Sequence, residues 1–153
     1  MTTFTETALE RHCRRYREKD LLPAVVDPAS MRILLQVGAT YGAVTMPTEL
    51  GEQVLTRLRA AGIAGPVFAH PRARRWTFLT GPPRHEEFTA TAAAELFRLY
   101  TTVAGTGSQI VLPSAEDEVS GYRLWVAGPD ALGTRPPQHA VIDAARECSA
   151  GTR

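Results

Sequence analysis

The sequence lacks the features that mark secreted or membrane-spanning proteins. It has two cysteines, Cys13 and Cys148, near opposite ends, whereas a disulfide-dense secreted domain of this length would need more. No apolar run approaches the roughly 18 residues of a membrane span. The first residues show no basic region followed by an apolar run, so they do not resemble a signal peptide. We therefore expect a cytoplasmic protein with no membrane partner.

An excess of charge of one sign is missing as well. The chain has 17 basic and 16 acidic residues and a net charge of +1, so no global field attracts it to nucleic acid or to an anionic membrane. Lys19 is its only lysine. We interpret this bias as the result of GC-rich coding rather than as a preference for the planar, bidentate partners that suit arginine.

Complete catalytic motifs are also absent. The candidate metal ligands show none of the paired spacings that bind zinc. They are His12, Cys13, His70, His85, His139 and Cys148. No serine lies in a nucleophile elbow, and we interpret the glycines at 105–107 as a tight turn because a strand, not a helix, should follow them. The acidic runs at 86–87 and 116–118 are interpreted as solvated loops. We therefore expect no metal, no cofactor, and a protein that binds rather than catalyses.

What is present is the patterning of one globular domain. The 153 residues, 44% of them hydrophobic, are enough to bury a core. Apolar periodicity predicts helices over 5–20, 48–61 and 138–148, with Thr48 as the cap of the second helix. It predicts strands over 31–37, 43–46, 66–70, 75–80, 108–112 and 122–126. The stretch 86–100 fits a helix or the start of a strand, and 113–121 is expected to be an acidic loop.

This order of elements predicts an α+β fold with a mixed or antiparallel sheet flanked by helices. Two hairpins are expected, one over 31–46 and one over 66–80. The loops are too short to separate two domains, so we expect a single domain over 1–148 and a frayed tail over 149–153.

Basic and aromatic residues gather on the second predicted hairpin. They are His70, Arg72, Arg74, Arg75 and Trp76. Arg123 and Trp125 alternate on a later strand, so both should face one side of it. Arginines beside aromatic rings can hold phosphates and stack on bases. The alternative interpretation is a solvated basic turn beside a tryptophan of the core.

Two stretches together resemble the primase–polymerase domain found at the N-terminus of bifunctional DNA primase/polymerases. One is GSQIVLPS at 107–114, with SGYRLW at 120–125 and the prolines at 136–137. The other runs from GAVTMP at 42–47 through the following helix to GPV at 65–67 and RWTF at 75–78. The resemblance covers roughly 31–137 and implies a primase–polymerase-like scaffold. The chain also resembles short actinobacterial proteins of unknown role.

The resemblance fails at the positions that carry the chemistry of this family. The family uses an Asp-x-Asp pair on one strand, a histidine on the next hairpin and a further acid, and these fall at Thr45 and Pro47, at Trp76 and at Thr102. None of these side chains can serve as the anionic oxygen ligand that two-metal phosphoryl transfer requires. The resemblance therefore implies a relative that has lost catalysis.

Three hypotheses of function follow. The first is a non-catalytic binding or regulatory domain that takes a nucleotide, nucleic acid or partner protein near Arg72, Arg74, Arg75, Trp76, Arg123 and Trp125. The second is a protein-interaction module, a homodimer that pairs through the N-terminal helix. The third is an enzyme or small-molecule binder whose site is not recognisable from the sequence.

Overall fold

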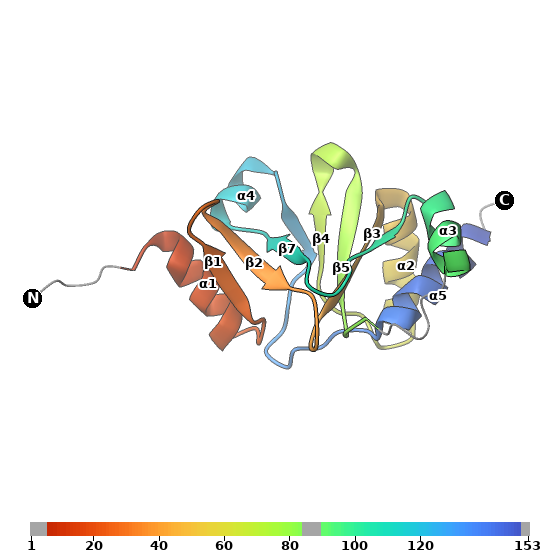
Figure 1. The fold of residues 1–153 in the computed structure, drawn as a ribbon, viewed down its shortest axis with the longest axis horizontal. Coiled ribbons are helices and arrows are strands. Elements are labelled where there is room, and N and C mark those ends of the chain that lie inside the picture. Colours follow the sequence, from red (N-terminus) through yellow and green to blue (C-terminus); the bar gives the residue numbers. More distant parts are fainter. Residues whose placement is uncertain (1–5, 84–89, 151–153) are drawn as a thin grey trace, which may run out of the picture.

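The computed structural model describes residues 6–83 and 90–150, which form an α+β fold with two antiparallel sheets (Figure 1). The helix α1 (Ala8–Glu18) lies at one end of the long axis of the molecule, and α3 (Ala90–Arg98) and α5 (Gln138–Ala150) lie at the other end. The predicted fold class is confirmed. The expectation of one sheet is wrong, because the strands divide between a sheet of three and a sheet of five.

The smaller sheet has the order β1-β2-β7 and consists of β1 (Ala24–Asp27), β2 (Arg32–Gln36) and β7 (Gln109–Leu112). β1 was not predicted, because the prolines on both sides of it, Pro23 and Pro28, indicated only the end of a helix. The four residues between them pair with β2 through a turn in which Met31 N–H donates to the Asp27 carbonyl. Thr7 caps α1, which therefore begins at Ala8 rather than at residue 5.

The larger sheet has the order β6-β3-β5-β4-β8. Its strands are β3 (Gly42–Pro47), β4 (Val67–His70), β5 (Arg75–Thr80), β6 (Thr102–Val103) and β8 (Leu124–Ala127). The predicted hairpin over 66–80 is confirmed as β4 and β5, joined by the 3₁₀ turn Pro71–Ala73. The predicted hairpin over 31–46 is wrong, because β2 and β3 enter different sheets. Packing against neighbouring strands and the core outweighs local strand preference here, so adjacent strands in the sequence do not pair.

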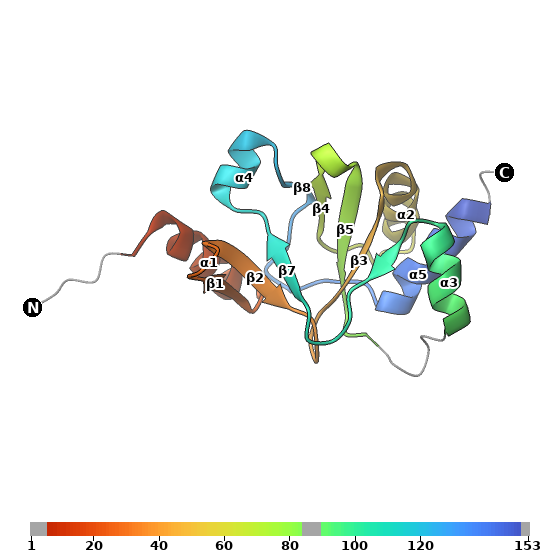
Figure 2. The same ribbon diagram turned by 45° about the horizontal axis from the view of Figure 1, so that its top comes forward.

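Two hydrophobic cores lie on the two faces of the larger sheet. One joins α1, the smaller sheet and one face of the larger sheet, and the other joins the opposite face to α2 (Thr48–Ala60) and α5. The first includes Ile33, Leu35, Phe68 and Leu79, and the second includes Val44, Met46, Val54 and Val141. Figure 2 shows the resulting order along the molecule: α1, the smaller sheet, the larger sheet, and then the helices α2, α3 and α5.

The N-terminus of α2 differs from the predicted cap. Pro47 occupies the N-cap position without a side-chain hydrogen bond, and Thr48 is the first helical residue. The Thr48 N–H donates instead to the Arg74 carbonyl, 3.0 Å away, in the turn between β4 and β5. The tip of this hairpin is therefore tied to the start of α2.

In three further segments, the secondary structure was left undecided by the sequence or differs from the prediction. The described part of 86–100 contains α3, and β6 follows it; residues 86–89 lie outside the described residues, as do Thr5 and His85. The predicted acidic loop over 113–121 is wrong, because it contains α4 (Ala115–Ser120). α5 extends to Ala150, so two of the five residues expected to fray are helical, and 151–153 are not described. No helix in the described residues has the length and hydropathy to cross a membrane.

Candidate anion-binding cluster

The hairpin of β4 and β5 places two of the predicted site residues side by side. His70 and Arg75 are directly paired across the two strands, so their side chains share one face of the sheet. This is the face toward the smaller sheet, because Phe68, two residues before His70, belongs to the core on that side. The Arg75 guanidinium donates to the Thr45 carbonyl over 3.3 Å, which holds it along the neighbouring strand β3.

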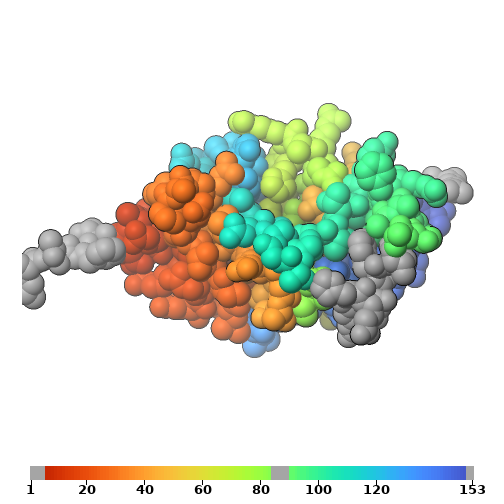
Figure 3. Space-filling view, in the orientation of Figure 1, coloured from red at the N-terminus to blue at the C-terminus, as the bar shows by residue number. Residues whose placement is uncertain are grey.

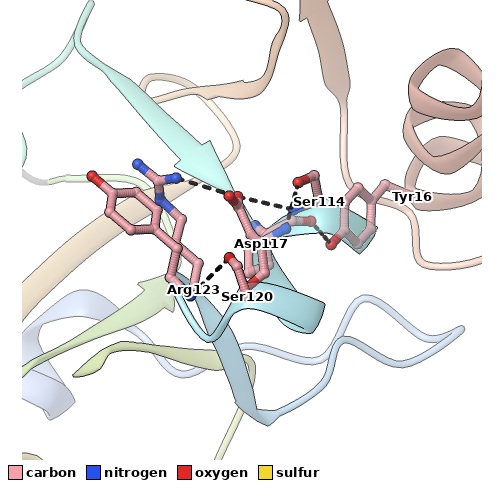
Figure 4. Close-up of polar contacts among 7 residues, drawn as sticks. Tyr16, Ser114, Asp117, Ser120 and Arg123 are labelled. Carbon is pink, nitrogen blue, oxygen red and sulfur yellow. Dashed lines mark hydrogen bonds and ion pairs between the residues drawn. The ribbon is translucent and has the colours of Figure 1, made fainter. Parts of the chain in front are cut away.

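Arg123, immediately before β8, contributes a third basic residue. It is only 7% exposed, and its Nη1 donates to the Asp117 carboxylate over 3.2 Å. Asp117 also accepts from the Ser114 N–H, while the Ser114 hydroxyl accepts from the Asp117 N–H, so the two residues form a capping box for α4 (Figure 4). The Asp117 carboxylate thus both caps the N-terminus of α4 and holds the side chain of Arg123 in place.

The positive charge of this region exceeds what its acid neutralises. Burial lowers the pKa of His70, and the nearby Arg123 and Arg75 lower it further, while Asp117 opposes them. The Arg123 Nε is buried and finds no hydrogen-bond partner in the described residues. A buried donor without a partner is costly unless a ligand or water satisfies it. The two arginines near His70 also outnumber its one acidic neighbour, so the electrostatic potential here favours an anion.

Tyr122 is the aromatic residue of this region, and the sequence reasoning did not select it. The guanidinium carbon of Arg123 lies 4.6 Å from the centre of its ring, and that of Arg72 lies 5.6 Å away. Arg72 thus joins His70, Arg75 and Arg123, and we call these three arginines and the histidine the cationic cluster. Figure 3 shows the yellow-green tip of the β4–β5 hairpin projecting from the surface near the blue of α4. In the sequence, only the position of Tyr122 between Gly121 and Arg123 could have indicated this role, and that pattern is weakly specific.

The two tryptophans do not line the cationic cluster. Trp76 is paired with Met46, so it faces α2, where a Cβ built on Gly51 would lie 2.9 Å from its ring. Trp125 packs edge-on against Phe68 at 5.6 Å and donates its Nε1 proton to the Tyr16 hydroxyl. Both rings therefore pack against the hydrophobic cores. This agrees with the alternative interpretation of the sequence, in which the tryptophan beside the basic turn belongs to the core. Arg74 has a left-handed backbone, with φ of 54°, and is exposed at the turn.

Three of the four positions that the sequence resemblance would assign to catalytic groups share one face of the larger sheet. Thr45 is paired with Thr102, and Pro47 lies two residues farther along β3. The Thr45 and Thr77 hydroxyls are hydrogen bonded at 3.0 Å. Trp76 points to the opposite face. Neutral hydroxyls and a proline line the place of the expected acids, and the described residues contain no group of three His, Cys, Asp or Glu arranged to hold a metal.

Hollows of the surface occur elsewhere in the described residues. One of about 430 Å³ lies between α1 and the start of α4, and its lining includes Arg11, His12 and Glu18. A second, of about 250 Å³, lies between α3 and α5 beside Glu95 and Arg146. Neither includes a residue that the sequence nominated as a binding residue. The lining of the first also has the cationic side chains of Arg14, Arg15 and Lys19, and the acids Glu18 and Glu6 (3.2 Å from Arg14) offset only part of this positive charge.

Comparisons with protein-family models, with curated proteins and with solved structures find no match to this chain.

Proposed function

We propose that this chain is a non-catalytic binding domain that holds the phosphate groups of a nucleotide or nucleic acid at the cationic cluster. The observation that carries the proposal is the buried guanidinium of Arg123. It has one acidic partner and an unpaired Nε, and His70 lies close enough to both Arg123 and Arg75 for the two arginines to lower its pKa. A ligand with several anionic oxygens would offset the positive charge that the two arginines place around His70.

Phosphate suits these groups for two physical reasons. Guanidinium presents a planar fork of donors that matches phosphate oxygens in pairs, and such charge-assisted hydrogen bonds are roughly twice as strong as neutral ones. Burial also removes competing water, so a charge on the ligand interacts more strongly here than at an exposed arginine. The primase–polymerase resemblance, in which nucleotides are substrates, supports the same class of ligand.

The proposal is for binding without chemistry, because of the residues at the aligned catalytic positions. Thr45, Pro47 and Thr102 offer no carboxylate to bring a divalent metal next to a bound phosphate. Phosphoryl transfer depends mainly on positioning and on the electrostatic stabilisation that metal ions and cationic side chains supply. A domain with the cations but without the acids can retain phosphate and leave it intact, which suits a regulatory role.

The test is calorimetric titration with tripolyphosphate, ATP and an oligothymidylate at low and at physiological salt. We expect binding that weakens as salt rises. Arg123→Met and Arg75→Gln should each weaken binding of tripolyphosphate by at least about tenfold, given the strength of hydrogen bonds to charged groups. The matched control is Arg59→Gln, an exposed arginine on α2, across the larger sheet from the cationic cluster.

Circular dichroism and urea unfolding establish that each variant is folded before its affinity is compared. Arg75→Gln is the safer of the two, because Arg75 is half-buried and donates one hydrogen bond to a carbonyl. Wild-type protein that binds none of the three probes at low salt would refute the proposal. So would an equal loss of affinity in Arg59→Gln.

A further inference from the structure

The exposed aromatic ring beside the cationic cluster belongs to Tyr122. It is 40% exposed, whereas Trp76 and Trp125 are packed into the two cores. Two other exposed aromatic residues of the described chain, Phe97 and Tyr100, lie at the end of α3, in a different part of the molecule. An aromatic group of a ligand held by the cationic cluster would therefore meet Tyr122.

The backbone of Tyr122 is fixed although its ring is exposed. Gly121 ends α4 with a φ of 77°, a left-handed conformation that glycine adopts without strain. The N–H groups of Gly121 and Tyr122 both donate to the Asp117 carbonyl, the latter over 2.9 Å. Two hydrogen bonds therefore hold the backbone that carries the ring, so a ligand that stacks on it would need to order mainly the side chain.

The same arginine lies next to the ring and to the proposed phosphate position. The Arg123 guanidinium carbon is 4.6 Å from the centre of the Tyr122 ring, and this guanidinium is the buried member of the cationic cluster. A ligand with a phosphate on Arg123 would thus have its remaining part close to Tyr122. Nucleotides combine an anionic group with a flat aromatic base, and this pair of neighbouring sites fits that combination.

In the structure, Arg72 lies over the Tyr122 ring, so a stacking base would have to displace Arg72 or insert between Arg72 and the ring. Arg72 is exposed, and its guanidinium carbon is 5.6 Å from the ring centre, close to the outer limit for a cation–π contact. Such exposed contacts change an equilibrium by roughly 2- to 5-fold. Stacking of one base on an aromatic side chain strengthens binding by roughly 5- to 140-fold, so the base is the stronger partner.

We infer that Tyr122 is the base-stacking residue of this domain, and that its ligand is a nucleotide or a single-stranded nucleotide chain rather than an inorganic or sugar phosphate. This inference rests on the proposed function, because the cationic cluster supplies the phosphate site. It assigns the discrimination between ligand classes to one side chain outside the cationic cluster.

The experiment compares ATP with tripolyphosphate: the two share the phosphate chain, but ATP adds the nucleoside and carries one negative charge fewer, so a preference for ATP must come from the nucleoside. Wild-type protein should bind ATP about 5- to 140-fold more tightly. Tyr122→Leu should bring this ratio close to one while leaving the affinity for tripolyphosphate within about twofold. Tyr122→Trp should preserve the ratio, and Tyr100→Leu, which removes an exposed tyrosine beside α3, is the control. Oligothymidylate distinguishes a chain from a single nucleotide.

The outcomes separate this inference from the proposed function. Tight binding of tripolyphosphate with no added affinity for ATP would overturn the role of Tyr122 and leave the phosphate site standing. A Tyr122→Leu variant that weakens both ligands equally would also overturn it, because the ring would then only support Arg123. Failure of every probe to bind would overturn both.

Discussion

Arg123 and Tyr122 show how differently two adjacent residues are used. The arginine is 7% exposed and paired with Asp117, while the tyrosine is 40% exposed and stacks on that arginine. The Asp117 side chain is 20% exposed, so water can solvate its charge in part once Arg123 is removed, and the cost to stability should stay below that of breaking a fully buried ion pair. Arg123 therefore has a structural role as well as the binding role proposed for it, and its variants need a separate stability measurement.

His70 makes protein stability depend on pH in a direction set by its neighbours. Burial and the two arginines hold the pKa of folded His70 below its ordinary value of 6.5, so the unfolded chain takes up a proton first as pH falls. The contribution of His70 to the free energy of unfolding is therefore complete above pH 6.5, and it is lost as the pH falls from 6.5 toward the pKa of His70 in the folded protein. We expect His70→Gln to lose less stability than wild type between pH 7.5 and 5.5 in urea unfolding.

The control is His139→Gln, which removes an exposed imidazole on α5. It should keep the wild-type loss of stability on the acid side. A bound phosphate has the opposite effect on His70, because its negative charge favours the protonated imidazole. The affinity for a phosphate ligand should thus rise as the pH falls from 7.5 to 5.5. In the unfolding experiment, a wild-type stability that does not change over this pH range would contradict the environment described for His70.

Among the elements, α4 depends most on its cap. It has six residues, too few to be stable by helix propensity alone, and it begins with the reciprocal bonds between Ser114 and Asp117. The spacing of a serine and an acid three residues later is a recognisable capping signal. It was overlooked because the surrounding prolines, glycines and acids favoured a loop.

Loss of the Ser114 hydroxyl should therefore loosen α4 specifically. We expect Ser114→Ala to lower the free energy of unfolding by about 0.5–2 kcal/mol and to speed amide hydrogen exchange over 115–121. Val119→Ala, at a residue of the same helix that is 90% exposed, is the control and should have a smaller effect. Unchanged exchange in Ser114→Ala would mean that packing, not the cap, holds α4.

Elements with strong local signals could be predicted, and those set by distant partners could not. The β4–β5 hairpin, α2 and α5 carry alternation or helical periodicity within one segment. β1 is four residues between two prolines, and only its pairing with β2 makes it a strand. The separation of β2 from β3 depends on which core each joins, which local sequence does not encode.

The candidate site shows the same division. His70 and Arg75 were selected from one hairpin, and their direct pairing follows from its register. Strand alternation also implies that Arg75 and Trp76 face opposite ways, so the tryptophan could have been assigned to the core from the sequence. The contact of Arg72 with Tyr122 joins a hairpin tip to the end of α4 and has no local signal.

At the scale of the whole molecule, a buried hydroxyl connects both sheets to α1. Tyr16 of α1 donates to the Pro113 carbonyl over 2.5 Å, at the end of β7, and accepts from the Trp125 Nε1 of β8 over 2.9 Å. Burial raises the pKa of Tyr16, so the hydroxyl keeps its proton and both bonds persist over the ordinary pH range. One side chain thus ties the first helix to the last strand of each sheet.

We expect Tyr16→Phe to destabilise the protein by about 1–3 kcal/mol, because it leaves a buried carbonyl and an indole N–H without this partner. The matched control is Tyr100→Phe, which removes a hydroxyl from a residue that is 74% exposed; its change should stay within about 0.5 kcal/mol. Equal urea midpoints for the two variants would show that the hydroxyl of Tyr16 contributes nothing net.

The interleaving of the strands constrains the order in which the chain can fold as it is made. β1 and β2 emerge early, yet one edge of β2 stays open until β7 arrives, since Ile33 pairs with Leu112. All of β3, β4 and β5 are synthesised in between. A growing chain therefore carries an apolar two-stranded ribbon with a free edge, a form prone to pair with another copy. Truncation before residue 109 would make that exposure permanent, and such fragments should self-associate.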